Sequence, residues 1–426
     1  MQDTLFSKEG YLSDKEIINY LNHIVDEIKE GANLLIIPPD YTRKYSGSGK
    51  IVAELYELLK YKAENIDILI ASGTHDPMSE EMLVEMFGKN IELENFHAHN
   101  WREDTKEIAV LPAEFLEDLS DGLINEAIPL KINKMIVDNK YDLVLSVGQV
   151  LPHEVVGMAN YTKNIVVGCG GKEIINKSHY LGAVAGIENI LGRDHSPVRK
   201  LYDYAEENFL QDIPLKYILT VCSTEQDAES SHTKIKGLFY GRNRNTFEKA
   251  VELSQQENIK VLEHKYDKII VYLDPNEFKS TWLGNKAVYR TRLAIADGGK
   301  LMIAAPGINK FGEDEEIDKL IRKYGYLKSE EISKLVEANE DLQDNLSAAA
   351  HLMHGSSEGR FEIFLAAPNL SRAEVEKVNY NYLELEELKD KYNLNELKPG
   401  HNSLTIDGVK EEIYFIDNPA TGLWKA

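Results

Sequence analysis

Three apolar stretches of the sequence are each followed by side chains that bind anions or exchange protons. Asp40 and Arg43 follow the first stretch, His75 follows the second and His153 follows the third. Histidine exchanges protons near neutral pH, and arginine holds a carboxylate or a phosphate through two parallel hydrogen bonds. Taken singly, Asp40 and His75 are also explained as turn or helix-capping residues. The threefold repetition favours a ligand site.

Residues 152–183 contain the densest set of such side chains, with His153, Lys163 and His179 among small residues and few acids. The glycines of this segment are Gly168, Gly170 and Gly171. They fit a helix–strand turn, or a close approach of the backbone to a phosphate. Neither a Walker A nor a GxGxxG motif is present. Lys163 taken alone is also explained as a surface lysine, and His179 as a capping or core residue of an amphipathic helix.

The elements that position these residues alternate between buried strands and helices. Continuous runs of Ile, Val and Leu predict strands of a parallel sheet that is covered on both faces. The strands are predicted at residues 33–38, 66–71, 141–147, 217–222, 268–273 and 300–305, with helices at 49–60 and 79–87. This alternation predicts an α/β fold. Ligands bind beyond the carboxyl ends of strands in such sheets, where Asp40, His75 and His153 stand.

The length of 426 residues suggests more than one domain, at roughly 150 residues per domain. We predict an N-terminal α/β catalytic and cofactor-binding domain over 1–268 and a C-terminal α/β domain over 269–426, both with mainly parallel sheets. The last residues can return to the first domain, and a boundary near 230 is the alternative. Charge-dense helices are expected in 313–345 and 371–397. The polar segment 225–233 predicts a surface loop.

Composition excludes several classes of protein. The 48 Lys and Arg residues against 71 Asp and Glu residues give a net charge of −23, which argues against nucleic acid and anionic membranes as partners. Two cysteines are too few for a cysteine-rich metal site or a disulfide framework. The N-terminus does not resemble a signal peptide, and no apolar run approaches the ~18 residues that span a bilayer. We therefore expect a cytoplasmic protein.

The pattern resembles the family of the nickel-pincer-nucleotide lactate racemases and their relatives. That family has Asp-x-x-Arg after its first strand, matched by Asp40 and Arg43, and Gly-x-His-x-Pro after the next strand, matched by residues 73–77. The further matches are His153 after a proline, Lys163 ten residues on, His179 sixteen residues beyond, and Lys286 twelve residues ahead of a Gly-Gly pair. The matches are dense over 34–185 and looser over 265–310.

The resemblance implies a cofactor and a metal. The cofactor is pyridinium-3,5-bisthiocarboxylic acid mononucleotide, the nickel pincer. It binds nickel through two sulfurs and a ring carbon, and it is linked covalently to Lys163. A square-planar ion with soft sulfur donors and one imidazole suits Ni(II), and His179 is the implied imidazole ligand. Such a cofactor explains how a chain with two cysteines can hold this metal. Enzymes of cofactor maturation are then expected partners.

The resemblance also implies a reaction, in which a 2-hydroxy acid is racemised or epimerised by reversible hydride transfer to the cofactor in a cleft between the two domains. His75 and His153 would exchange the hydroxyl proton. Arg43 and Lys286 would hold the substrate's negative groups. Asp40 would orient one of these cations or a histidine, and Trp282 would form a wall of the substrate pocket.

Two departures from the family change the expected substrate. Asn160-Tyr161-Thr162 stands where the family has Ser-Gly-Gly, and Leu283 stands where lactate racemases have a substrate-contacting glutamine. A larger acid, for example a sugar acid, is therefore favoured over lactate. Three alternatives remain open: a non-catalytic relative that binds a nucleotide or a small carboxylic acid, an ordinary pyridine-nucleotide oxidoreductase, and Lys286 as part of the exposed face of a helix over 285–296.

Overall fold

The fold is described from a computed structural model, which covers residues 3–138, 140–223, 233–420 and 422–426. The loop predicted at 225–233 lies outside these residues except for Thr233. The chain divides into a first unit of Met1–Ser178 with Ile190–Asn258 and a second unit of His179–Asn189 with Ile259–Ala426. The domain limits predicted from the sequence, 1–268 and 269–426, stay a prediction. Within the described residues, no helix is long and apolar enough to cross a membrane.

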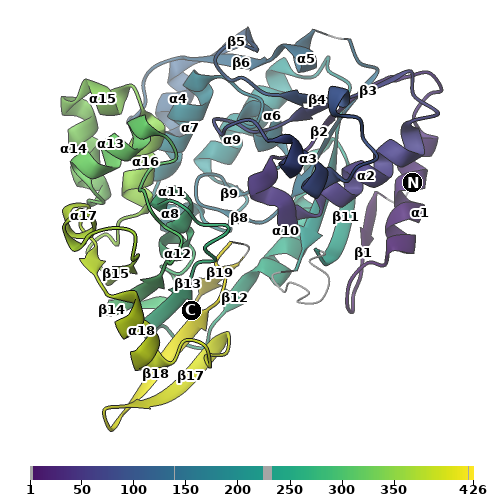
Figure 1. Ribbon diagram of the computed structural model, residues 1–426. Coiled ribbons are helices and arrows are strands. Elements are labelled where there is room, and N and C mark those ends of the chain that lie inside the picture. The colour runs from purple at the N-terminus through teal and green to yellow at the C-terminus, as the bar shows by residue number, and fades with distance from the viewer. Residues whose placement is uncertain (1–2, 139, 224–232, 421) are drawn as a thin grey trace. The chain divides into compact units, whose positions relative to one another are not determined.

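The first unit is built on a sheet of seven strands among the described residues (Figure 1). The neighbouring strands from β10 to β4 run parallel, whereas β11 runs antiparallel to β10 and β1. Across the sheet the order is β1 (Thr4–Phe6), β11 (Ile235–Gly241), β10 (Leu215–Cys222), β7 (Leu143–Gln149), β2 (Asn33–Ile37), β3 (Asn65–Ile70) and β4 (Phe96–Ala98). The strands predicted in this half of the chain are therefore confirmed, with ends shifted by at most two residues.

Helices cover both faces of this sheet, as the apolar runs predict. Leu34 and Ile36 pack in one core with helices α1 (Asp14–Asp26) and α2 (Ser48–Leu59), while Leu35 and Ile37 point to the other face and are equally buried. The other elements are α3 (Glu80–Phe87), α4 (Ala113–Leu119), α5 (Lys134–Val137), α6 (Thr162–Val166), α9 (Pro197–Phe209), α10 (Arg244–Asn258), the 3-10 turns η1 (Tyr41–Ser46) and η2 (Leu93–Asn95), and the antiparallel pairs β5 (Thr105–Leu111) with β6 (Ile128–Asn133) and β8 (Pro152–His153) with β9 (Gly157–Met158).

The second unit contains a sheet of six strands within the described ranges. Its order is β16 (Asn381–Tyr382), β15 (Glu362–Ala366), β14 (Ile295–Ala304), β13 (Tyr266–Tyr272), β18 (Val409–Ile416) and β17 (Gly400–Ile406). Only β17 is antiparallel to its neighbour, as the yellow hairpin of Figure 1 shows. A separate parallel pair joins β12 (Ile259–Val261) to β19 (Leu423–Lys425). The predicted α/β class with mainly parallel sheets is thus confirmed.

Helices of the second unit bury two separate cores with this sheet, and the smaller core contains Leu385 and Leu388 of the last helix. The helices are α8 (Ile187–Ile190), α11 (Thr281–Gly284), α12 (Lys286–Tyr289), α13 (Glu315–Tyr324), α14 (Ser329–Ala338), α15 (Glu340–Gln343), α16 (Leu346–His354), α17 (Arg372–Lys377) and α18 (Leu385–Tyr392). The charge-dense segment 313–345 is helical as predicted. In the segment 371–397, strand β16 interrupts the predicted helix and separates α17 from α18.

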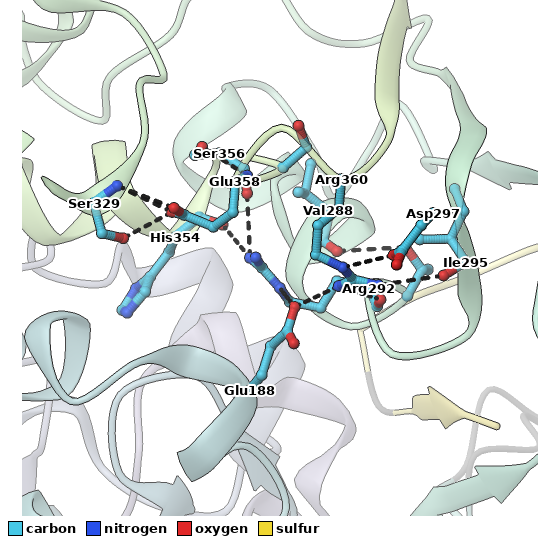
Figure 2. Close-up of polar contacts among 12 residues, drawn as sticks. Glu188, Val288, Arg292, Ile295, Asp297, Ser329, His354, Ser356, Glu358 and Arg360 are labelled. Atoms are coloured by element: carbon cyan, nitrogen blue, oxygen red, sulfur yellow. Dashed lines mark hydrogen bonds and ion pairs between the residues drawn. The ribbon is translucent and has the colours of Figure 1, made fainter. Parts of the chain in front are cut away.

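Helix α7 (Lys172–Val184) begins in the first unit and ends in the second. Glu188 lies near the end of the segment His179–Asn189, which belongs to the second unit, and it pairs with two arginines of that unit (Figure 2). Its Oε1 accepts hydrogen bonds from Arg292 Nε at 3.1 Å and from Arg360 Nη1 at 2.5 Å. Arg292 is 1% exposed and also donates to the carbonyls of His354 and Ser356. The pairing therefore ties the segment that carries His179 to the second unit.

Glu188→Gln is expected to lower the free energy of unfolding by about 1–2 kcal/mol, because the buried guanidinium of Arg292 loses its carboxylate and keeps only carbonyl acceptors. This loss is smaller than that for a fully buried ion pair, because the Glu188 side chain is 38% exposed. Urea unfolding followed by circular dichroism measures the change. Glu362→Gln is the control, since Glu362 pairs with Lys300 at 3.8 Å on the surface. Equal losses in the two variants would contradict the role of the buried pair.

Candidate functional site

The carboxyl ends of β2 and β3 lie side by side in the first unit. Pro39 pairs with Ala71 in a parallel bridge, and the Ala71 amide donates to the Pro38 carbonyl at 2.8 Å. Beyond the bridge, the turn that leads to His75 passes through Gly73 at a φ of +59°, a value that favours glycine. This arrangement brings the side chains that follow two separate strands to one edge of the sheet, as the sequence predicts.

Asp40 and His75 form a hydrogen-bonded pair at this edge. His75 Nδ1 donates to Asp40 Oδ2 at 2.5 Å, and Thr42 Oγ1 donates to Asp40 Oδ1 at 2.6 Å. Burial raises the pKa of Asp40, but the charge and hydrogen bonds of His75, Thr42 and Arg43 outweigh it and hold this pKa below its usual value. Asp40 therefore stays a carboxylate. With its proton on Nδ1, a neutral His75 presents an Nε2 lone pair that can accept a proton.

Lys163 is the second residue of α6 and lies within electrostatic reach of Arg43 and Asp40. Burial, and next the positive charge of Arg43, lower the pKa of the Lys163 amine to about 8, against the smaller opposing effects of Glu154 and Asp40. The amine is therefore partly neutral, and nucleophilic, close to physiological pH. This environment differs from that of the surface lysine that the sequence left as an alternative.

Lys163 is expected to react with acetic anhydride half-maximally near pH 8 in the apoprotein, about two pH units below an ordinary lysine. Its neutral fraction rises as the pH passes through the lowered pKa, so its reaction rate should level off above pH 9. Peptide mass spectrometry after pulses of labelled reagent measures the rate, with N-acetyl-lysine amide in the same tube as the reference. A rate that still climbs in parallel with the reference above pH 9 would contradict the lowered pKa.

His153 stands in the short β8–β9 hairpin that follows β7 and is 5% exposed. Its Nδ1 accepts the Val155 amide at 3.1 Å and lies 3.7 Å from the Glu154 carboxylate. A nitrogen that accepts an N–H carries no proton, so a neutral His153 carries its proton on Nε2. The two histidines therefore differ in this structure: Nδ1 of His75 donates to Asp40, whereas Nδ1 of His153 accepts from the Val155 amide.

The glycine segment after α6 is a packed turn. A Cβ at Gly168 would lie 2.4 Å from the Asn164 carbonyl and 2.9 Å from Ala71, so only glycine lets α6 approach the end of β3. His99 supports this turn, because its Nε2 donates to the Gly170 carbonyl at 3.0 Å while its Nδ1 accepts from Asn133 at 2.9 Å. Burial lowers the pKa of His99, which is therefore a neutral structural residue. The glycines therefore form a turn, but it lies between helix α6 and the helix Lys172–Val184 and not between a helix and a strand.

The other three predicted site residues belong to the second unit. Lys286 is 6% exposed and begins the one-turn helix α12, with its ammonium 5.6 Å from the ring of Phe278. The alternative that Lys286 lies on the exposed face of a helix over 285–296 is therefore wrong, because that segment turns into β14 and buries the lysine. The ring of Trp282, on α11, lies 4.5 Å from the ring of His351 of α16, at an interplanar angle of 34°. His179 is half-buried on α7.

Among the described residues, one group of carboxylate and imidazole side chains has the spacing of a metal site. Asp194, His195 and Glu248 lie close enough to share an ion, but Arg244 already pairs with both carboxylates, at 2.6 and 3.5 Å. The thiols of Cys169 and Cys222 are buried, which raises the pKa of both, that of Cys222 to about 12. Neither thiol supplies a thiolate at neutral pH. These donors therefore fit a cofactor that brings its own sulfur better than a metal site made from protein sulfur.

Sequence reasoning missed three residues near this site. Gln149 ends β7 and is 5% exposed, and its Nε2 has no hydrogen-bond partner within the described residues, which suits a ligand oxygen. Glu154 follows His153 directly, a position that adjacency alone could have indicated. Arg199 lies 36 residues beyond Lys163 and contacts the turn before it, and no local pattern marks it.

Part of the chain is similar to a known protein family, and its fold is similar to that of solved structures. Residues 17–189 match the family model described as the lactate racemase N-terminal domain. A crystal structure of a Thermotoga maritima protein superposes with a TM-score of 0.84 at 23% identity, over 99% of both chains. The lactate racemase apoprotein of Thermoanaerobacterium thermosaccharolyticum superposes with a TM-score of 0.70 at 18% identity, over 98% of this chain and 94% of that one. No curated protein matches in sequence. Residues 17–189 are therefore similar to the lactate racemase N-terminal domain, and the fold of the chain is similar to that of the lactate racemase apoprotein.

Proposed function

We propose that this protein is an isomerase that racemises or epimerises a 2-hydroxy acid with a nickel-pincer nucleotide bound to Lys163. The observation that carries the proposal is the amine of Lys163. It lies in a lactate racemase N-terminal domain, and burial and Arg43 lower its pKa to about 8. A neutral amine is what a covalent link to a cofactor carboxyl or thiocarboxyl group requires. The adjacent Asp40–His75 pair supports acid–base chemistry at the same edge of the sheet.

The chain's own residues would divide the work of holding the cofactor. Lys163 provides the covalent link, and His179 provides the single imidazole for a nickel ion whose other donors come with the cofactor. The Nε2 of Gln149 and the guanidinium of Arg43 are available in the first unit to oxygen atoms of a nucleotide or a substrate. When bound, the cofactor supplies an acceptor for the hydrogen on the α-carbon of the substrate.

Proton exchange with the substrate hydroxyl is assigned to His75 and His153. His75 accepts the hydroxyl proton at Nε2, because Asp40 holds the other ring proton and stabilises the positive charge that forms. His153, whose neutral ring carries its proton on Nε2, would donate a hydrogen bond to the substrate oxygen. His75 would give the same proton back to this oxygen when the α-carbon regains its hydrogen on the opposite face, so that no net proton is gained or lost.

The substrate is proposed to be a 2-hydroxy acid larger than lactate, such as a sugar acid. Arg43 and Lys286 provide two cations for its negative and polar groups. Trp282 contributes an aromatic wall. Leu283 packs against the core of the second unit where a lactate racemase would contact its substrate through glutamine.

The test is to produce the protein together with enzymes of cofactor maturation and to measure three quantities. Intact mass should show one adduct on Lys163, metal analysis should show one nickel per chain, and chiral chromatography should show interconversion of at least one acid in a panel from lactate to sugar acids. A deuterium label on the α-carbon should be retained in the product. An unmodified mass without nickel would overturn the proposal. An adduct without turnover across the panel would favour the alternative, a non-catalytic relative that binds a nucleotide or a small acid.

A further inference from the structure

The turn that precedes Lys163 is strained. Asn160 has a φ of 64° and Tyr161 has a φ of 60°, so two successive residues other than glycine occupy the left-handed region. This conformation is strained for a residue other than glycine and persists only where its surroundings impose it. The Asn164 amide donates to the Tyr161 carbonyl at 2.9 Å, so this turn also begins helix α6. Whatever holds the turn therefore also orients Lys163.

Arg199 of α9 holds the turn from both sides of the strained pair. It is 1% exposed, and its Nη2 donates to the carbonyls of Met158 at 2.7 Å and Asn160 at 3.0 Å. Its Nη1 donates to Thr162 Oγ1 at 2.5 Å, and Thr162 in turn donates to Asp203 at 2.9 Å. One rigid guanidinium thus fixes three points within five residues. A lysine could not match this geometry, because it has a single nitrogen.

Aromatic packing completes the clamp. The ring of Tyr161 stacks on Phe247 at 4.9 Å and 12°, and its hydroxyl donates to the Arg242 carbonyl at 2.8 Å. The Arg199 guanidinium lies 4.4 Å from the centre of the same Phe247 ring. On the other side, Asn160 fits against Gly148 so closely that a Cβ at 148 would lie 1.6 Å from its amide nitrogen. The turn is therefore a built feature of the fold.

We propose that Arg199 is a positioning residue for Lys163, which by clamping the strained turn 158–162 holds the Lys163 amine in the buried orientation that takes the cofactor. The inference rests on the proposed function only for the identity of the group that Lys163 receives. Arg199 is also close enough to affect the charge of the Lys163 amine. Burial and the charge of Arg43 lower the pKa of Lys163 most, and the charge of Arg199 lowers it further.

The test compares Arg199→Lys and Arg199→Met with the control Arg292→Lys in the apoprotein. Arg292 is equally buried and also binds two carbonyls, but in the second unit (Figure 2). We expect both Arg199 variants to release the turn, so that Lys163 becomes more hydrated and reacts with acetic anhydride about tenfold more slowly at pH 7, a shift of one pH unit. Arg292→Lys should leave the Lys163 profile unchanged while it lowers the melting temperature. Folded Arg199 variants with a rate within threefold of the wild type would overturn the proposal.

A rescue variant separates positioning from general stability. Asn160→Gly accepts the positive φ without strain, so the turn needs less restraint. Asn160→Gly combined with Arg199→Lys should recover at least half of the lost Lys163 reactivity. If Arg199→Lys alone does not fold, the double variant is compared directly with the wild type. No recovery would contradict the clamp. All of these acetylation rates are measured on the apoprotein. A wild-type protein that takes no cofactor adduct would therefore refute the proposed function, while the role of Arg199 would still be decided by the acetylation rates.

Discussion

Lys163→Arg, produced with the enzymes of cofactor maturation, is expected to carry no covalent adduct and to have no racemase activity. Arginine keeps the positive charge beside Asp40 and Glu154, so the local fold should persist. Its guanidinium remains protonated at any physiological pH and is a poor nucleophile, whereas the Lys163 amine is about half neutral near pH 8. The variant therefore removes the nucleophile and preserves the charge. Intact mass and chiral chromatography measure the two losses.

Lys172→Arg is the matched control for this experiment. Lys172 lies nine residues further along, is exposed at the start of α7, and should keep both adduct and activity when replaced. If Lys163→Arg still carries the adduct, the linkage lies elsewhere and the central assignment is wrong. Tryptic mapping of the wild-type adduct then locates the true site, so the result is informative in either case.

Asp40→Asn is expected to reduce turnover by about 10²–10⁴-fold and to leave the adduct on Lys163. The Asp40 carboxylate accepts the Nδ1 proton of His75 at 2.5 Å, which keeps a lone pair on Nε2. An amide can present its NH₂ group to Nδ1 instead, which moves the ring proton to Nε2 and removes the base. The variant also loses the negative charge that stabilises a protonated His75. Turnover of the loaded enzyme on the best acid of the panel measures the effect.

Thr42→Val serves as the control, because it removes the other hydrogen bond to Asp40 and leaves the pair with His75 intact. A loss below tenfold is expected for Thr42→Val, and an equal loss in both variants would contradict the assignment of His75 as the base. The pH dependence follows from the lowered pKa of Asp40. Stability from the pair is fully present above the ordinary aspartate value, about 3.9, and is lost as the pH falls through the lower value of the folded state. Asp40→Asn should therefore remove part of the acid-induced loss of stability below pH 4.

Several features of the fold could be predicted because they depend on local patterns. The runs that become β2, β3, β7 and β10 are apolar on both faces, and in a parallel sheet their carboxyl ends must meet at one edge. The pairing of Asp40 with His75 follows from that rule although the two residues are 35 positions apart. The amphipathic pattern after residue 172 likewise predicts the helix that carries His179.

Other features depend on contacts that no local pattern encodes. Lys286 looks like an exposed helix residue in sequence, but the chain turns after one helical turn and encloses it. Glu188 resembles any surface acid until Arg292 and Arg360, more than a hundred residues away, are brought to it. Arg199 reaches the turn before Lys163 from a separate helix. Each case depends on the packing of elements that are distant in the chain.

The sequence by itself therefore determined the α/β class, the main strands, and the order of Asp40, Arg43, His75, His153 and Lys163 along the chain. Only the tertiary structure decided the protonation states of Lys163, His75 and His153. The pKa of Lys163 is low because the fold buries the amine beside Arg43, and the ring protons of the histidines are assigned because Asp40 and the Val155 amide lie where they do. Periodicity specifies elements through short-range geometry, whereas desolvation, charge and hydrogen-bond direction depend on distances that exist only after the elements pack.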